Sequence, residues 1–209
     1  WEKRRHGYDI KREWLRFSAG VVPGLYWFVS ILTQPEDACL VLTPCYYPFL
    51  DAVKDTGRRL VCCNLVNKKG YYTIDLNRFE EEITRNNVKL FILCSPHNPV
   101  GRVWKPDELK GLLDICKKYN VFVISDEIHQ DIVLKGHKNI PAATTGDYDE
   151  WLVTLSAASK AFNLAGLNNA FAVIPNESIR KKFDQYIRTI QVLNKGCMFG
   201  YAATEAAFN

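Results

Sequence analysis

The chain has 209 residues, of which 47% are apolar and 24% are charged, and its 27 basic and 23 acidic residues give a net charge of +4. These proportions exclude a disordered, collagen-like or low-complexity chain. The longest apolar stretch, residues 20–32, is short and contains Pro23 and Gly24, so no membrane span is predicted.

The first half of the sequence predicts helices and strands in alternation. Residues 24–33 form a helix candidate, and the apolar run at 38–43, bounded by Pro44, predicts a buried strand. A second helix candidate covers residues 48–57. The apolar run at 88–94 then predicts a second buried strand.

The second half continues this alternation. Pro106 opens a predicted helix whose apolar residues recur at helical spacing, and Asn176 can cap a last helix with a similar apolar stripe. Between these two helices, three apolar runs predict strands at residues 121–125, 151–155 and 170–174.

Strands that are apolar on both faces and alternate with helices predict an α/β fold. We expect three layers, α/β/α, around a mostly parallel central sheet. Right-handed crossovers then place all the strand carboxyl ends at one edge, where ligands of such folds bind.

The seven cysteines are odd in number and include no C-x-x-C pair, which argues against a disulfide framework and against a zinc or redox motif. Cys94 and Cys116 lie in apolar patterns, where a free thiol packs as a small hydrophobic group. The cysteines therefore predict a reducing compartment, the cytoplasm.

Basic residues are concentrated at the beginning of the chain, where residues 1–16 hold six of them. Such a cluster is compatible with nucleic-acid binding, but no motif that reads a nucleic acid accompanies it. We interpret it as a solvated surface and predict neither a nucleic-acid nor a membrane partner.

Polar and reactive side chains follow four of the predicted strands at the point where each strand ends. Residues 43–46 are Thr-Pro-Cys-Tyr, 95–98 are Ser-Pro-His-Asn, 125–129 are Ser-Asp-Glu-Ile-His, and 156–160 are Ser-Ala-Ala-Ser-Lys. At one sheet edge these segments would combine an aromatic ring, an amide, a carboxylate, an imidazole and an amine.

This set of side chains matches the needs of pyridoxal phosphate. A lysine can form an imine with an aldehyde, and a buried carboxylate can keep a pyridine nitrogen protonated. A tyrosine can stack on the ring, while amide and imidazole groups can bind its hydroxyl oxygen. Residues 19–24, just before a predicted helix, can offer backbone N–H groups to the phosphate.

The motifs resemble those of the pyridoxal-phosphate-dependent aminotransferase superfamily of fold type I, and within it the cystathionine β-lyase (C–S lyase) branch. They lie at residues 17–25, 43–49, 95–104, 125–131 and 159–167.

The resemblance implies a domain organisation and a partial chain. Residues 1–20 would be an N-terminal segment leading into the large domain, and 21–193 would form the cofactor-binding large domain. Residues 194–209 would begin the connection to a C-terminal small domain that is largely absent. Because the sequence starts at Trp1 and stops within a helical pattern, we expect it to be part of a longer protein.

The resemblance also assigns roles at the ring. Lys160 would bind the cofactor covalently and then act as the base that moves protons. Asp126 would pair with the pyridine nitrogen, and Tyr46 would stack on the ring.

Four more residues are assigned cofactor contacts in the same way. Asn98 and His129 would contact the ring hydroxyl. Val21 and Val22 would donate backbone N–H groups to the phosphate.

The phosphate site departs from the family pattern. Many relatives have an arginine eight residues after the lysine, where this chain has Asn168, and a serine three residues before it, where this chain has Ala157. Ser156 or Ser159 is expected to compensate.

Simpler roles remain open for several of these residues. Asp126 can be a helix cap, Tyr46 plain core, and His129 a hydrogen-bonded structural histidine. Asp126, Glu127, His129 and Asp131 also resemble a metal cluster, but neighbours on an extended segment diverge and no further motif completes a shell, so no metal is predicted.

Three functions follow from the sequence. The first is a C–S β-lyase that converts sulfur amino acids into a thiol, a keto acid and ammonia. An aminotransferase with the same cofactor is the second, and a non-catalytic cofactor-binding or dimerisation domain is the third. The resemblance implies a small amino-acid substrate and a homodimer of the full-length protein.

Overall fold

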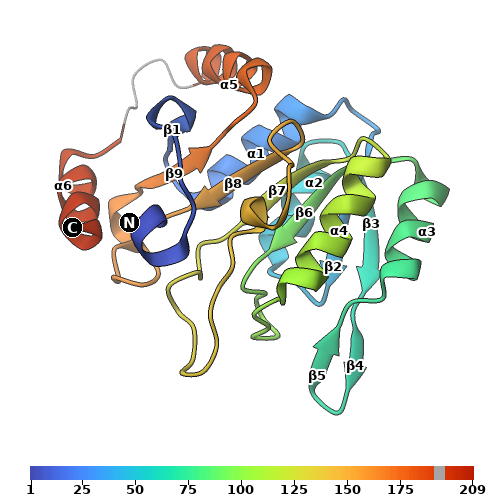
Figure 1. Cartoon of the computed structure of the whole chain (residues 1–209). Coiled ribbons are helices and arrows are strands. Elements are labelled where there is room, and N and C mark those ends of the chain that lie inside the picture. Colours follow the sequence, from blue (N-terminus) through green and yellow to red (C-terminus); the bar gives the residue numbers. More distant parts are fainter. Residues whose placement is uncertain (191–195) are drawn as a thin grey trace.

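The computed structural model describes residues 1–190 and 196–209, and its centre is a seven-stranded sheet with the order β1-β9-β8-β7-β6-β2-β3 (Figure 1). A separate hairpin, β4–β5, extends beyond one end of the sheet. The strands are β1 (Leu15–Ser18), β2 (Ala38–Thr43), β3 (Arg59–Asn64), β4 (Val66–Lys68), β5 (Tyr71–Thr73), β6 (Val88–Cys94), β7 (Phe122–Asp126), β8 (Leu152–Ser156) and β9 (Ala170–Val173).

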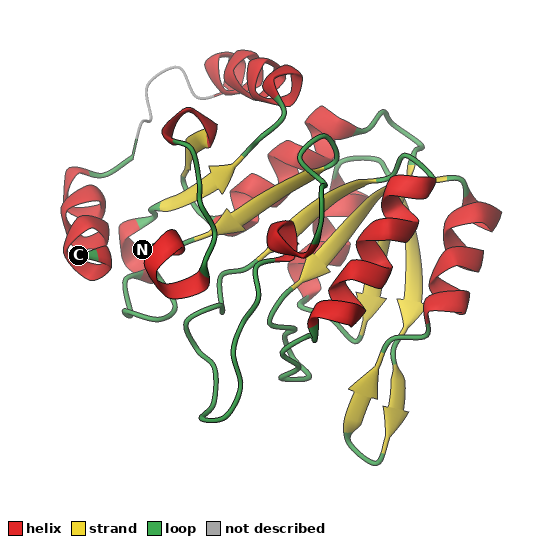
Figure 2. Ribbon diagram, in the orientation of Figure 1, coloured by secondary structure: helices red, strands yellow, loops and turns green. Residues whose placement is uncertain are grey.

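Helices cover both faces of this sheet, which confirms the predicted three-layer α/β/α fold (Figure 2). One face is covered by α1, α2 and α5, and the other by α3 and α4. The helices are α1 (Val21–Leu32), α2 (Tyr47–Asp55), α3 (Leu76–Asn86), α4 (Pro106–Lys118), α5 (Glu177–Ile190) and α6 (Met198–Phe208), with short helical turns η1 (Glu2–His6), η2 (Arg12–Trp14), η3 (Ala142–Thr145) and η4 (Ala165–Leu167).

Five consecutive strands, β8, β7, β6, β2 and β3, are parallel, so their carboxyl ends meet at one edge as predicted. The expectation that all strands end there is wrong for β9, which runs antiparallel to β8 and to β1. The connection between β8 and β9 contains only the short helical turn η4 and no crossover helix, and the chain returns beside β8 in the opposite direction.

All five predicted strands are present, with bounds shifted by at most one residue. The predicted helix at 24–33 begins earlier, at Val21, because Pro23 fits in the first turn of α1. Asn176 caps α5 through a 3.1 Å hydrogen bond from the N–H of Ile179 to its side-chain oxygen. The boundary expected between residues 193 and 194 lies outside the described residues.

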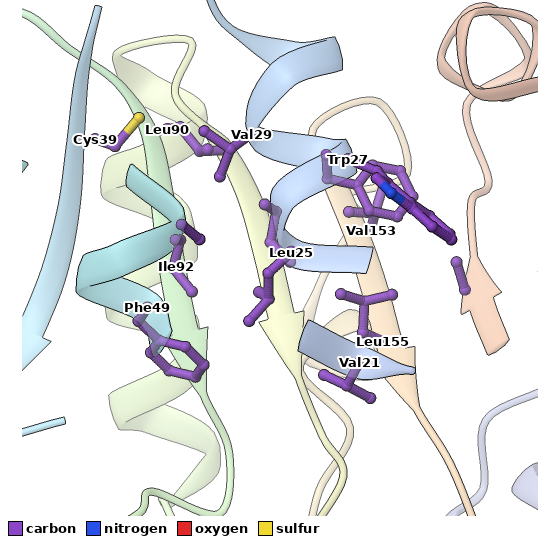
Figure 3. Packing of buried hydrophobic residues seen from close by; sticks show 14 of the residues in the cluster. Val21, Leu25, Trp27, Val29, Cys39, Phe49, Leu90, Ile92, Val153 and Leu155 are labelled. Carbon is purple, nitrogen blue, oxygen red and sulfur yellow. The ribbon is translucent and has the colours of Figure 1, made fainter. Parts of the chain in front are cut away.

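The hydrophobic core on the α1 side holds the sheet edge in place. Leu25 and Val29 of α1 are fully buried, and Figure 3 shows their side chains among those of Ile92, Val153 and Leu155 from the strands. This contact fixes α1 against β6 and β8, and therefore fixes where its N-terminus lies.

Gly24 sets how closely α1 approaches β8. A Cβ at this position would lie 2.9 Å from Cδ2 of Leu155, which is fully buried, and 3.1 Å from Oγ of Ser18. We expect Gly24→Ala to lower the free energy of unfolding by about 1–2 kcal/mol, because overpacking outweighs the gain in helix propensity. Denaturant unfolding measures this, with Gly166→Ala as control, where a Cβ meets nothing within 4 Å. Equal stabilities of the two variants would contradict this close approach.

Within the described part of the chain, no helix combines the length and the apolar character needed to cross a bilayer.

Candidate active site

A cavity of about 230 Å³ lies at the carboxyl edge of the parallel strands. Its walls come from the N-terminus of α1 and from the segments that follow β2, β6, β7 and β8. The structure brings together in this one cavity all seven residues that the sequence singles out: Val21, Val22, Tyr46, Asn98, Asp126, His129 and Lys160.

Asp126 provides a buried acid on the floor of the cavity. It is the last residue of β7 and is 4% exposed, and its Oδ1 accepts a 3.1 Å hydrogen bond from the N–H of Ile128. Burial raises the pKa of the Asp126 carboxyl to about 7, although the Ile128 hydrogen bond and the charge of Lys160 each act to lower that pKa. A cation held against this carboxyl would therefore favour its charged form.

Lys160 lies in the turn that follows β8 and lines the same cavity, although much of its side chain is exposed. Its positive charge acts on both Asp126 and His129, lowering the pKa of each. The amine and the acid are thus electrostatic neighbours.

The remaining side chains surround this pair. Burial, and then the charge of Lys160, lower the pKa of His129, so its imidazole is neutral near pH 7. Tyr46 precedes the first residue of α2 and contacts Phe49 edge-on, with ring centroids 6.1 Å apart. Asn98 is half-buried on the loop after β6.

The first turn of α1 supplies backbone donors to the cavity. The first hydrogen bond of the helix joins the N–H of Gly24 to the carbonyl of Gly20 at 3.1 Å. The N–H groups of Val21 and Val22 precede this bond, and Pro23 has none, so two donors of this turn have no carbonyl within the helix. Such a helix N-terminus favours an anion.

The two positions at which the sequence departs from the family pattern of the phosphate site both line this cavity. Asn168, Ala157 and Ser159 line it. Ser156 is buried instead, and its Oγ donates a 3.3 Å hydrogen bond to the carbonyl of Glu127. Of the two serines expected to compensate, only Ser159 is therefore among the lining residues.

One further lining residue with a reactive side chain, Cys94, was not predicted from the sequence to lie at the site. Cys94 was interpreted only as buried core, and it is 2% exposed, but it also lines the cavity. Its Sγ accepts a 3.4 Å hydrogen bond from the N–H of Asn98. Its position as the last residue of β6, at the same edge as Asp126, was the available signal.

In residues 1–190 and 196–209, no group of three or more His, Cys, Asp or Glu side chains is arranged to hold a metal ion.

Comparisons with known proteins identify relatives of this chain by sequence and by fold. The family model for aminotransferase class I and II matches residues 1–209. Cystathionine beta-lyase PatB from Bacillus subtilis (strain 168) is 39% identical over 212 residues, which cover 100% of this chain and 54% of that protein. The chain spans about half the length of the curated relatives it matches.

Solved structures agree with the family model. Cystalysin from Treponema denticola, which contains a pyridoxal 5'-phosphate cofactor, aligns with a TM-score of 0.95 at 38% identity, covering 100% of this chain and 53% of cystalysin. A pyridoxal-phosphate-bound protein from Clostridium difficile 630, assigned as an aminotransferase, aligns with a TM-score of 0.96 at 44% identity, covering 100% and 54%. Because the family model spans the whole sequence, this chain belongs to the aminotransferase class I and II family.

Proposed function

We propose that this chain is the cofactor-binding part of a pyridoxal-phosphate-dependent C–S β-lyase. The observation that carries the proposal is the cavity in which Lys160 and the buried Asp126 meet the free N–H groups of α1. The proposed products are a thiol, a keto acid and ammonia from a small sulfur amino acid.

The donor set of the cavity fits the cofactor. Asp126 is a buried acid that a pyridinium nitrogen would keep charged, and Lys160 is an amine for the aldehyde. Val21 and Val22 offer N–H groups for the phosphate, and Ser159 adds a hydroxyl.

The ring itself would lie among three further side chains. Tyr46 offers an aromatic face, and Asn98 and neutral His129 offer hydrogen-bonding groups for the ring hydroxyl.

When bound, pyridoxal phosphate supplies an electron-accepting ring that stabilises negative charge at the substrate Cα. Lys160 Nζ takes the Cα proton, which makes it the general base of the reaction. Asp126 holds positive charge at the ring nitrogen by its own negative charge. As the C–S bond breaks, the sulfur would leave with the bonding electron pair and take up a proton, while the electron pair at Cα would form a Cα–Cβ double bond. Water would then hydrolyse the released enamine to the keto acid and ammonia.

The proposal extends to the whole protein. Residues 1–20 would lead into a large domain at 21–193, and 194–209 would begin the connection to a small domain. A homodimer in the cytoplasm is proposed for the longer enzyme, and the seven free cysteines support a reducing compartment.

The name of one relative favours elimination, since the Bacillus subtilis protein is a cystathionine beta-lyase. Transamination is the second candidate, because the Clostridium difficile relative is assigned as an aminotransferase. The two reactions would differ in what happens after proton removal from Cα, when either the sulfur leaves or the proton is added to the cofactor.

Cystathionine, supplied with and without a keto-acid acceptor, separates these outcomes in the enzyme that contains this chain. We expect thiol and ammonia to be released at the same rate whether or not the acceptor is present. If the only product is the amino acid formed from the keto-acid acceptor, and no thiol is released without the acceptor, the chain belongs to an aminotransferase instead. Absence of visible cofactor absorbance after incubation with pyridoxal phosphate overturns both.

A further inference from the structure

His97 is a buried histidine that the proposed reaction does not use. It lies on the loop between β6 and α4, is 2% exposed, and contacts the ring of Trp104 edge-on at a centroid distance of 5.4 Å. Its main-chain N–H donates a 2.7 Å hydrogen bond to the carbonyl of Arg102. The backbone of His97 is therefore fixed within its own loop.

The side chain of His97 reaches a different loop. Its Nε2 lies 2.9 Å from the carbonyl oxygen of Pro44, in the segment that follows β2. A carbonyl oxygen only accepts, so Nε2 carries the hydrogen and donates. Burial lowers the pKa of His97, although the backbone groups of Pro44 and Cys94 act to raise that pKa, and the lowered pKa agrees with a neutral ring.

Among the described residues, the Nδ1 atom makes no hydrogen bond of good geometry, although the Cys94 backbone lies close enough to the ring to raise its pKa. A buried polar atom without a well-formed hydrogen bond is costly, and an apolar side chain of similar size would avoid that cost. What the imidazole adds at this position is its hydrogen bond to Pro44.

That bond joins the two loops that carry Tyr46 and Asn98. Tyr46 follows Pro44 by two residues, Asn98 follows His97 directly, and both line the cavity. The strands that precede these loops, β2 and β6, are neighbours in the sheet, but their hydrogen bonds end before the loops begin.

The loop that carries Asn98 is held rigid on its other side. Arg102 forms an ion pair with Glu108 of α4 at 2.7 Å, and Nε1 of Trp104 donates a 2.8 Å hydrogen bond to the carbonyl of Cys94. Because this loop is fixed, the hydrogen bond from His97 to Pro44 also fixes the segment that carries Tyr46.

We infer that His97 is a positioning residue that sets the placement of Tyr46 relative to Asn98 and thereby sets the affinity for the cofactor. This inference rests on the proposed function. His97 acts through the carbonyl of Pro44 and is not among the residues that line the cavity of the proposed site.

Three variants of the enzyme that contains this chain test the inference: His97→Gln, His97→Asn and His97→Leu. The glutamine amide can place its nitrogen near the position of Nε2 and donate to Pro44, whereas the asparagine amide is too short and leucine has no donor. The measurements are the dissociation constant of pyridoxal phosphate from the reconstituted apoenzyme and the pH midpoint of the bound cofactor's visible absorbance.

We expect His97→Leu and His97→Asn to weaken cofactor binding about tenfold and to move the absorbance midpoint, because losing one buried hydrogen bond has an effect of this size. His97→Gln should stay within about threefold of the wild type and keep its midpoint. His137→Leu, at an exposed histidine, is the control and should change neither.

Equal affinities and midpoints for His97→Leu and the wild type overturn the inference, as does a glutamine variant that loses as much as the asparagine variant. If His97→Leu does not fold, the comparison of glutamine with asparagine decides. A wild-type enzyme that fails to bind pyridoxal phosphate rejects the proposed function itself, which separates that failure from the failure of the role of His97.

Discussion

Replacing Lys160 by alanine is expected to remove the covalent attachment of the cofactor and to lower kcat for thiol release by about 10³-fold or more. Lys160 is assigned two roles, binding of the aldehyde and removal of the Cα proton, and general-base catalysis alone contributes 10²–10⁴-fold. Borohydride reduction followed by peptide mapping measures the attachment, and a thiol-release assay measures kcat. The variant should still fold, because much of the Lys160 side chain is exposed.

Lys182→Ala is the matched control, since Lys182 is an exposed lysine on α5, outside the residues that line the cavity. It should keep the borohydride-trapped cofactor and the kcat of the wild type. Thiol release at the wild-type rate by Lys160→Ala, or trapping of the cofactor on another lysine, would contradict the assignment of Lys160.

The parallel core of the fold could be predicted because its strands are continuous apolar runs. A strand such as β6 is buried on both faces, and its seven residues are apolar apart from Lys89. By contrast, the edge strand β3 begins at Arg59 and alternates between buried and exposed positions, and its apolar run, residues 60–63, is only four residues long. The hairpin β4–β5 was not predicted, because none of its strand residues is fully buried and its sequence therefore contains no apolar run.

Helix α3 was missed for a related reason. Its apolar stripe consists of only three residues, Leu76, Phe79 and Ile83, of which the last two are buried, and the rest of the helix is polar or charged. The direction of β9 is a tertiary property, because an apolar run has the same composition whether its strand runs parallel or antiparallel.

The candidate site could be predicted because each of its residues lies in the first turn of a helix, at the end of a strand or within four residues after one, and parallel topology then brings these positions to one edge. Contacts between loops carry no such signal. The bond from His97 to Pro44 joins residues 53 positions apart, and nothing in the sequence pairs them. The burial of Ser156, opposite to the exposure of Ser159, depends in the same way on how the turn after β8 folds.

Asp126→Asn is expected to change stability and activity in opposite directions. Without cofactor, burial raises the pKa of Asp126 to about 7 from its ordinary value of 3.8, so the folded state favours the protonated acid. The folded wild type then holds more protons than the unfolded chain between these two pH values, and its stability falls as the pH rises from about 4 to about 7. Asparagine cannot ionise, and its Oδ1 can still accept the hydrogen bond from the N–H of Ile128.

The apo form of Asp126→Asn should therefore match the wild type near pH 4 and exceed its free energy of unfolding near pH 8, by a difference on the order of 4 kcal/mol at most. Urea unfolding of both apoproteins across this pH range measures the difference. Asp149→Asn, at an exposed carboxylate, is the control and should follow the wild type at every pH.

With cofactor bound, the same substitution removes the negative charge opposite the ring nitrogen. We expect kcat for thiol release to fall about 10²-fold, since an opposite charge within about 4–6 Å shifts a pKa by 1–3 units. A stabilised apoprotein with unchanged kcat would leave Asp126 a buried acid without a role at the ring. If the variant is less stable than the wild type at pH 8, then the charged carboxylate of Asp126 is stabilised by groups of the chain itself. A rise in the free energy of unfolding of the apoprotein together with a loss of turnover would show that the charge of Asp126 destabilises the fold and acts on the cofactor.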